Sequence, residues 1–134
     1  MASEADFDRI MSTVFARPPE VPAPFKRWFV ERALERRPCT LRIVDAIKPF
    51  LMDGLRGRMG AVGAPAFVLY GTADAVTDPS MLGVFAAEMP AARTALVPGA
   101  GHVAFSDDFR ATVTAMAEFL DWCGLSRSGR ALRP

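Results

Sequence analysis

Two short apolar runs in the second half of the chain constrain the fold more than any other feature. They are residues 66–70 (Ala-Phe-Val-Leu-Tyr) and 94–97 (Thr-Ala-Leu-Val), and residues 82–89 between them have helical apolar spacing. Unbroken apolar runs are typical of strands that are covered on both faces of a parallel sheet. Two strands joined by one helix become parallel neighbours with a right-handed crossover. The pattern therefore predicts a β-α-β unit and the α/β fold class.

Two helices complete this half of the chain. Asp78 and Pro79 are expected to open the helix between the strands. Its buried face comprises Leu82, Phe85, Ala86 and Met89. Ser106 is expected to cap a long final helix that ends at Gly124. The inward-facing stripe of that helix comprises Phe109, Val113, Met116, Leu120 and Cys123.

The first sixty residues predict helices with no strand between them. The helix face of the first comprises Phe7, Ile10, Met11, Val14 and Phe15, and Ser3 followed by Asp6 suits its amino-terminal cap. The Pro18-Pro19 pair stops this helix, and a second begins near Pro24. A third is expected after Pro38, capped by Thr40, and Pro49 kinks or ends it.

Composition restricts the classes of protein that the chain can belong to. With 134 residues, 51% of them hydrophobic and 23% charged, it is long and apolar enough for one folded domain. A formal net charge of +1 gives no electrostatic reason to expect nucleic acid. Cys39 and Cys123 lack metal-site spacing, and a single histidine is too few ligands, so we expect no metal and no cofactor. The sequence shows no secretion signal and no membrane span, so we expect a cytoplasmic protein that does not contact membranes.

An acid and a base follow the two predicted strands. Asp74 lies in Gly71-Thr72-Ala73-Asp74, and His102 lies in Gly99-Ala100-Gly101-His102. Because the carboxyl ends of parallel strands share one edge of a sheet, these side chains can meet there. A carboxylate that accepts from one ring nitrogen leaves the other nitrogen free to take a proton. Singly, the aspartate is also typical of a turn and the histidine of a solvated loop, but their order and placement favour the acid and base of a hydrolytic triad.

Residues 65–123 carry a family resemblance. With Phe-Val-Leu-Tyr-Gly-Thr-Ala-Asp, then Leu-Val-Pro-Gly-Ala-Gly-His, then an amphipathic terminal helix, the stretch resembles the carboxyl end of an α/β-hydrolase fold. The resemblance implies a helical lid-like or cap-like segment over 1–64, a βαβα portion with two parallel strands over 65–125, and a flexible tail over 126–134. It also implies that Asp74 is the triad acid and His102 the base, with Asp78 as the fallback acid.

The departure from the family pattern concerns the nucleophile. The family places it in a Gly-x-Ser-x-Gly turn upstream of the lid. That context surrounds none of the serines, which are Ser3, Ser12, Ser80, Ser106, Ser126 and Ser128, and the oxyanion-hole loop is missing too. The resemblance therefore implies the lid and carboxyl-terminal portion of a hydrolase of esters, amides or lactones, inactive as an isolated chain. The nucleophile type, serine, aspartate or cysteine, stays open.

The missing portion of the fold also predicts partners for the chain. A sheet of two strands leaves residues 67–70 at an exposed edge, which a separately encoded amino-terminal half or a second copy of the chain could cover. A small-molecule substrate is expected only for the intact enzyme, and Phe25, Trp28 and Phe29 fit either an apolar substrate or internal packing. A non-catalytic helical interaction module is the alternative from a different functional class.

Overall fold

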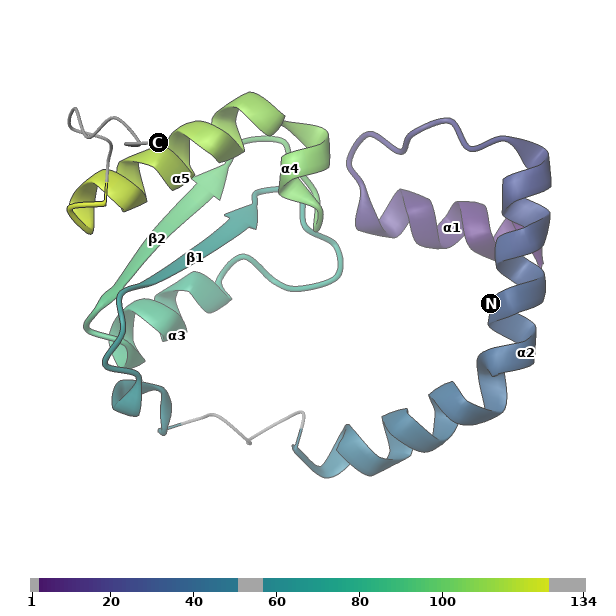
Figure 1. The fold of residues 1–134 in the computed structure, drawn as a ribbon, viewed down its shortest axis with the longest axis horizontal. Helices are drawn as coiled ribbons and strands as arrows, with labels where there is room; N and C mark the ends of the chain where they lie inside the picture. The colour runs from purple at the N-terminus through teal and green to yellow at the C-terminus, as the bar shows by residue number, and fades with distance from the viewer. Residues whose placement is uncertain (1–2, 51–56, 126–134) are drawn as a thin grey trace, which may run out of the picture.

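The computed structural model describes residues 3–50 and 57–125, which form a helical arm followed by a two-stranded α/β unit (Figure 1). The arm comprises α1 (Glu4–Val14), α2 (Ala23–Ile47) and the 3-10 turn η1 (Lys48–Phe50). The α/β unit comprises η2 (Met59–Ala61), β1 (Ala66–Gly71), α3 (Met81–Glu88), β2 (Ala92–Val97), α4 (Ala104–Asp107) and α5 (Phe109–Trp122). The predicted tail over 126–134 lies outside the described residues.

The two strands are parallel neighbours, as the apolar runs predict, so the α/β class is confirmed. Their register runs from Ala66 opposite Ala92 to Gly71 opposite Val97. Figure 1 shows α3 and α5 on opposite sides of the strand pair. On the α5 side, the rings of Phe67 and Phe119 stack with centroids 5.1 Å apart. Residues 66–70 are nevertheless only half-buried, because a sheet of two strands gives the helices little surface to cover.

The core of the α/β unit lies at the carboxyl ends of the strands. It consists of the buried residues Val97, Ala100 and Ala104, with Leu69 and Ala111 packed against them. Small side chains dominate this cluster, so the loop after β2 approaches both β1 and α5 closely. The best-packed part of the unit therefore lies directly beneath the loops that carry Asp74 and His102.

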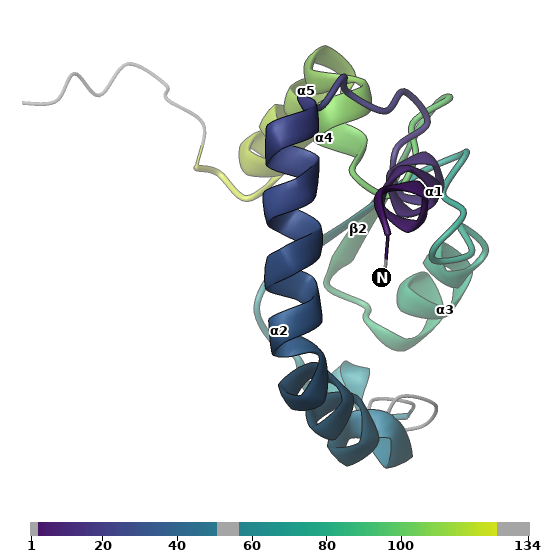
Figure 2. The ribbon, with the colours of Figure 1, turned by 90° about the vertical axis from the view of Figure 1, so that its right-hand side faces the viewer.

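The helical arm begins as the sequence predicts. Ser3 caps α1 by accepting a hydrogen bond from the Asp6 backbone N–H at 3.1 Å. Phe7, only 3% exposed, packs edge-on against Phe29 of α2 with ring centroids 5.4 Å apart. Pro24 lies in the first turn of α2, where its missing N–H removes no helical hydrogen bond. In Figure 2, α2 runs along one side of the molecule.

The prediction that a third helix starts after Pro38 is wrong. Pro38 lies inside α2, which continues to Ile47, and the Thr40 hydroxyl donates to the Arg36 carbonyl at 3.2 Å instead of capping a helix. Proline removes one helical hydrogen bond and bends the helix without always ending it. The carbonyl left without a donor belongs to the exposed residue Leu34, where water can reach it. Figure 1 shows the axis of α2 changing direction partway along.

The final helix differs from prediction at its start and in its buried face. Ser106 lies within α4, and Asp108 caps α5 by accepting from the Ala111 N–H at 2.9 Å. The predicted stripe of Phe109, Val113, Met116 and Leu120 is between 43% and 69% exposed. Ala111 and Phe119 contact the strand side instead, because a sheet of two strands covers only part of the helix surface. Gly124 ends the helix as predicted, with φ of 70° and a bond from the Leu125 N–H to the Leu120 carbonyl.

The helix between the strands begins at Met81, two residues later than Pro79 suggests. Asp78 accepts a hydrogen bond from the Ser80 N–H at 2.8 Å in the turn that precedes it. Within its predicted face, Leu82 and Met89 are buried, whereas Ala86 is exposed. The helix therefore covers the strands with fewer side chains than its apolar pattern predicts.

Replacing Gly71 tests the close packing at the strand ends. A Cβ at this position would collide with the Ala100 carbonyl oxygen, which belongs to the backbone. We expect Gly71→Ala to lower the free energy of unfolding by about 3 kcal/mol, as overpacking does. Gly83→Ala in α3, whose Cβ meets nothing within 4 Å, is the matched control and should stabilise slightly. Urea unfolding measures both, and equal midpoints for the two variants would contradict the packing argument.

Candidate functional site

The two loops at the carboxyl ends of the strands bring Asp74 and His102 together. Asp74 follows β1, His102 follows β2, and Asp74 Oδ2 lies 3.0 Å from His102 Nδ1. The Asp74 side chain is only 3% exposed, whereas that of His102 is 40% exposed. A buried carboxylate thus contacts one nitrogen of a ring that solvent reaches from the other side. Their catalytic roles stay a prediction.

Asp74 also forms the turn that follows β1. Its Oδ1 accepts hydrogen bonds from the backbone N–H groups of Val76 and Thr77 at 2.8 and 2.9 Å. Its Oδ2 accepts from the Thr77 hydroxyl at 2.8 Å and faces His102. The turn interpretation and the acid interpretation are therefore compatible, because each uses a different oxygen. Sequence reasoning missed Thr77, a hydroxyl three residues from the acid, although that spacing is typical of such turns.

These contacts set the charge of Asp74. Burial raises the pKa of its carboxyl, but hydrogen bonds from the Thr77 backbone, His102, the Thr77 hydroxyl and Val76 lower it more, to about 2. The group is therefore an anion at neutral pH and accepts hydrogen bonds only. A neutral His102 ring must then carry its proton on Nδ1, which leaves the lone pair on Nε2. No residue in the described part of the chain gives Nε2 a hydrogen-bond partner.

The loop that carries His102 is bonded to the loop that carries Asp74. The Gly99 N–H donates to the Thr72 hydroxyl at 2.7 Å, and the Ala73 N–H donates to the Ala100 carbonyl at 2.9 Å. Gly99 has φ of 69°, a conformation that side chains rarely adopt, so glycine suits this turn. These bonds fix the distance between the two loops, and therefore between Asp74 and His102.

Asp107 is a second buried carboxylate at the site, and sequence reasoning missed it. Its oxygens accept hydrogen bonds from the backbone N–H groups of Gly101, Ala16 and Arg17 at 2.8, 3.0 and 2.7 Å. Burial raises its pKa, but these three bonds and the charge of Arg17 lower it below the ordinary value. Two of its partners lie some ninety positions away in the chain, so no local spacing could have indicated them.

The remaining nucleophile and acid candidates lie elsewhere. Asp78 is bonded to the Ser80 backbone, and these bonds lower the pKa of its carboxyl. The Ser12 hydroxyl donates to the Asp8 carbonyl inside α1, and Cys39 is exposed on α2. Ser126 and Ser128 lie outside the described residues. Over 3–50 and 57–125, no hydroxyl or thiol contacts Nε2, and the Thr77 hydroxyl lies 3.3 Å from Nδ1, the nitrogen that faces Asp74.

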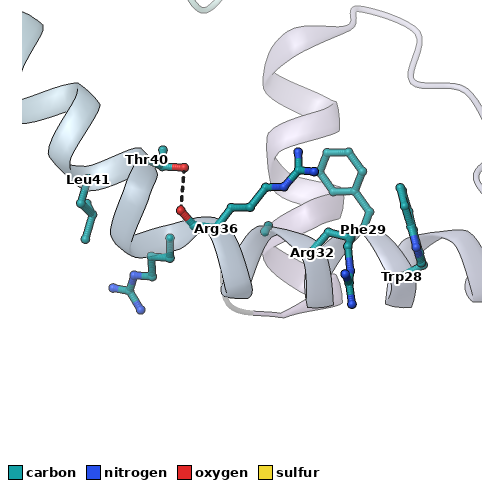
Figure 3. Close-up of a pocket in the computed structure, with 8 residues that line it drawn as sticks. Trp28, Phe29, Arg32, Arg36, Thr40 and Leu41 are labelled. Carbon is teal, nitrogen blue, oxygen red and sulfur yellow. Dashed lines mark hydrogen bonds between the residues drawn. The ribbon is translucent and has the colours of Figure 1, made fainter.

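A hollow of about 510 Å³ lies along α2, away from the Asp74–His102 pair. Figure 3 shows Trp28, Phe29, Arg32 and Arg36 projecting from the helix that forms it. Phe29 packs against Phe7 and Trp28 packs against Phe25, yet Phe25, Trp28 and Phe29 are each between 40% and 53% exposed. Their ring contacts belong to the packing of the arm, and a role toward an apolar substrate stays a prediction.

Two features of the described residues bear on metal ions and membranes. No group of three or more histidine, cysteine, aspartate or glutamate side chains gathers where it could hold a metal ion. No described helix combines the length and the apolar composition that crossing a bilayer requires.

Comparison with solved structures shows which proteins the fold is similar to. No protein-family model and no curated protein matches the sequence. The structure is similar to a bacterial membrane phospholipase A described as a virulence factor, with a TM-score of 0.81 and 25% identity over 93% of this chain and 40% of the phospholipase. It is also similar to a lipase-like protein from Acinetobacter baumannii AYE, with a TM-score of 0.76 and 15% identity over 92% of this chain and 43% of that one.

A thermophilic esterase matches with a TM-score of 0.62 and 21% identity, over 90% of this chain and 47% of the esterase. The chain therefore spans less than half the length of each of these three structures. Over that part it shares their mixed α/β architecture with two parallel strands, in agreement with an α/β-hydrolase-like fold.

The low pKa of Asp74 predicts how stability depends on acid. Its pKa falls from 3.8 to about 2, so its contribution to stability is complete above pH 3.8 and is lost as the pH falls through about 2. We expect that loss to be about 2 kcal/mol of unfolding free energy. Carbon-13 NMR of the Asp74 carboxyl measures the titration, and Asp74→Asn should remove this part of the pH dependence. A midpoint near the ordinary value would contradict the hydrogen-bond account.

Proposed function

We propose that this chain is the lid and carboxyl-terminal portion of an α/β hydrolase, with Asp74 as the triad acid and His102 as the base. The observation that carries the proposal is the 3.0 Å contact between Asp74 Oδ2 and His102 Nδ1, with Nε2 unpartnered by any residue of 3–50 or 57–125. Similarity to a phospholipase, a lipase-like protein and an esterase supports carboxylic esters as the substrate class. Residues 1–64 would be the lid and 65–125 the portion that carries the acid and the base.

The geometry supports a definite division of chemical roles. His102 Nε2 takes the proton of the nucleophile as the nucleophile attacks the ester carbonyl carbon. The imidazolium that forms is stabilised by the Asp74 carboxylate, which stays ionised. The same nitrogen then donates its proton to the leaving alcohol oxygen, and water repeats the sequence to release the acid. Asp74, held by Val76 and Thr77, keeps the ring in the tautomer that this proton transfer requires.

The nucleophile and the oxyanion donors are not among the described residues near His102. A triad without its nucleophile retains only residual catalysis, and that remaining activity depends on the oxyanion hole. On this proposal the chain by itself hydrolyses no ester at a rate that depends on His102. A fluorophosphonate probe, which labels activated serines, should leave it unlabelled.

The coding DNA upstream of Met1 tests the proposal first. We expect it to encode a strand followed by Gly-x-Ser-x-Gly, or a turn with aspartate or cysteine at the central position. A nucleophile turn of this kind in the same reading frame would place both portions in one polypeptide. A nucleophile turn in an adjacent frame would support the second candidate, a subunit that a separate chain completes. Absence of any such turn would contradict both candidates and leave a non-catalytic interaction module.

The second candidate has its own structural support. In the described sheet, β1 pairs with β2 along one edge, and no strand pairs with its other edge. The apolar stripe of α5 is exposed as well. Strand addition would supply partners for the backbone groups at that edge. If two frames encode the halves, their coexpressed products should copurify in equal amounts with esterase activity that neither half has alone.

Kinetics of the completed enzyme test the roles of the two residues. We expect His102→Ala and Asp74→Asn to lower kcat on p-nitrophenyl butyrate by roughly 10³–10⁴-fold, because both act on one proton transfer. Asp78→Asn is the matched control, since Asp78 is an aspartate four residues away that is bonded to the Ser80 backbone. Its kcat should stay within about threefold of the parent. Equal losses for Asp74→Asn and Asp78→Asn would refute the assignment of the acid.

A further inference from the structure

We infer that Asp107 is a positioning residue, which locks the backbone just before His102 to the end of α1. The inference rests on the proposed function for its catalytic consequence, whereas the contacts themselves belong to the structure. Figure 1 shows α1 beside α4 and the loop that follows β2. The hydrogen bonds across this junction all involve residues 14–17 on one side and 101–107 on the other.

Hydrogen bonds fix the backbone just before His102 and at His102 itself. Before it, the Gly101 N–H donates to Asp107 Oδ2 at 2.8 Å. At His102 itself, the backbone N–H donates to the Val14 carbonyl at 2.9 Å. Val14 is the last residue of α1, so the position of the ring depends on where α1 ends. Asp107 therefore controls the ring through the backbone and without touching it.

The carboxylate is suited to this task because both of its oxygens only accept hydrogen bonds. Oδ2 accepts from Gly101 and Ala16, and Oδ1 accepts from Arg17. An asparagine of the same shape would place an N–H₂ group against a backbone N–H, whichever way its amide turns. Because the residue is buried, water cannot readily replace the lost acceptor. The chemistry thus requires an acid at this position rather than a polar group of equal size.

Gly101 provides an independent sign of the same junction. A Cβ added there lies 2.7 Å from the Ala16 nitrogen and 2.9 Å from the Val14 oxygen, both of which are backbone atoms. The end of α1 therefore lies against the glycine with no room for a side chain. Any displacement of residues 14–17 must move Gly101, and His102 with it.

NMR of the ring tests the inference on the chain as it stands. His102 is the only histidine in the sequence, so its ring signals need no assignment. Nitrogen-15 shifts report the tautomer, and a downfield proton signal reports the Nδ1–H that Asp74 holds. We expect Asp107→Asn to weaken that proton signal and to mix the two tautomers. Asp108→Asn, the neighbouring acid that only caps α5, is the control and should leave both readouts as in the parent.

A second variant keeps the test decisive if Asp107→Asn does not fold. Gly101→Ala keeps the carboxylate but pushes the end of α1 away, and it should change the ring signals in the same direction. Gly83→Ala is its control. The indole signals of Trp28 and Trp122 report whether the arm and the α/β unit stay folded. Parental ring signals in both variants, or unfolding of both, would overturn the assignment of Asp107 as a positioning residue.

The completed enzyme supplies a kinetic readout. A displaced base should lower kcat by about 10²-fold while KM changes little, because the interaction lost acts in the transition state. The ring signals distinguish failure of the proposed function from failure of the role proposed for Asp107. A parent chain without the Nδ1–H tautomer would count against the proposed function, whereas a parent that has it and an Asp107→Asn variant that keeps it would count against the role of Asp107 alone.

Discussion

Three backbone N–H groups on one buried carboxylate link the helical arm to the α/β unit. Asp107 bonds Ala16 and Arg17 at the end of α1 and Gly101 beside the histidine, so it joins the helical arm to the α/β unit. The other hydrogen bonds across the described junction, from His102 and Val103 to the Val14 carbonyl, depend on the same approach. An anion that accepts three such bonds is stabilised by them against the cost of its burial. The same carboxylate therefore contacts both the end of the arm and the residue before the histidine.

The sheet positions the two loops of the site but covers little of the surrounding apolar surface. Two parallel strands end at the same edge, and the small residues beneath them, Ala100 above all, let the two loops approach within hydrogen-bond distance. Yet the same sheet covers little of α5, whose apolar stripe stays exposed, and leaves β1 half-buried. The part of the molecule that orders the acid and the base is thus well packed, while the surfaces remote from it expose apolar side chains.

Local patterns predicted the features that local physics controls. The apolar runs gave both strands, Ser3 gave the start of α1, and Gly124 gave the end of α5, since each depends on a few neighbouring residues. The prediction of a helix end at Pro38 is wrong because a proline can bend a helix without ending it. The prediction that Ser106 caps the final helix is wrong because Asp108, two residues later, also offers a side chain that can cap, and it accepts from the Ala111 N–H at the start of α5. The roles of Asp107 depend on contacts ninety residues apart, which no pattern along the chain encodes.

On the proposed assignment of Asp74 as the triad acid, one side chain can form the turn and also contact His102. Turn formation uses Oδ1, which accepts two backbone N–H groups, and this fixes the carboxylate before any histidine approaches it. Oδ2 is left to face the ring, together with the Thr77 hydroxyl. An acid held in this way loses little entropy when it orients the histidine, and its low pKa keeps the proton on the ring rather than on itself. If His102 transfers protons as proposed, the described residues hold its Nδ1 side through Asp74 and leave Nε2 for a nucleophile.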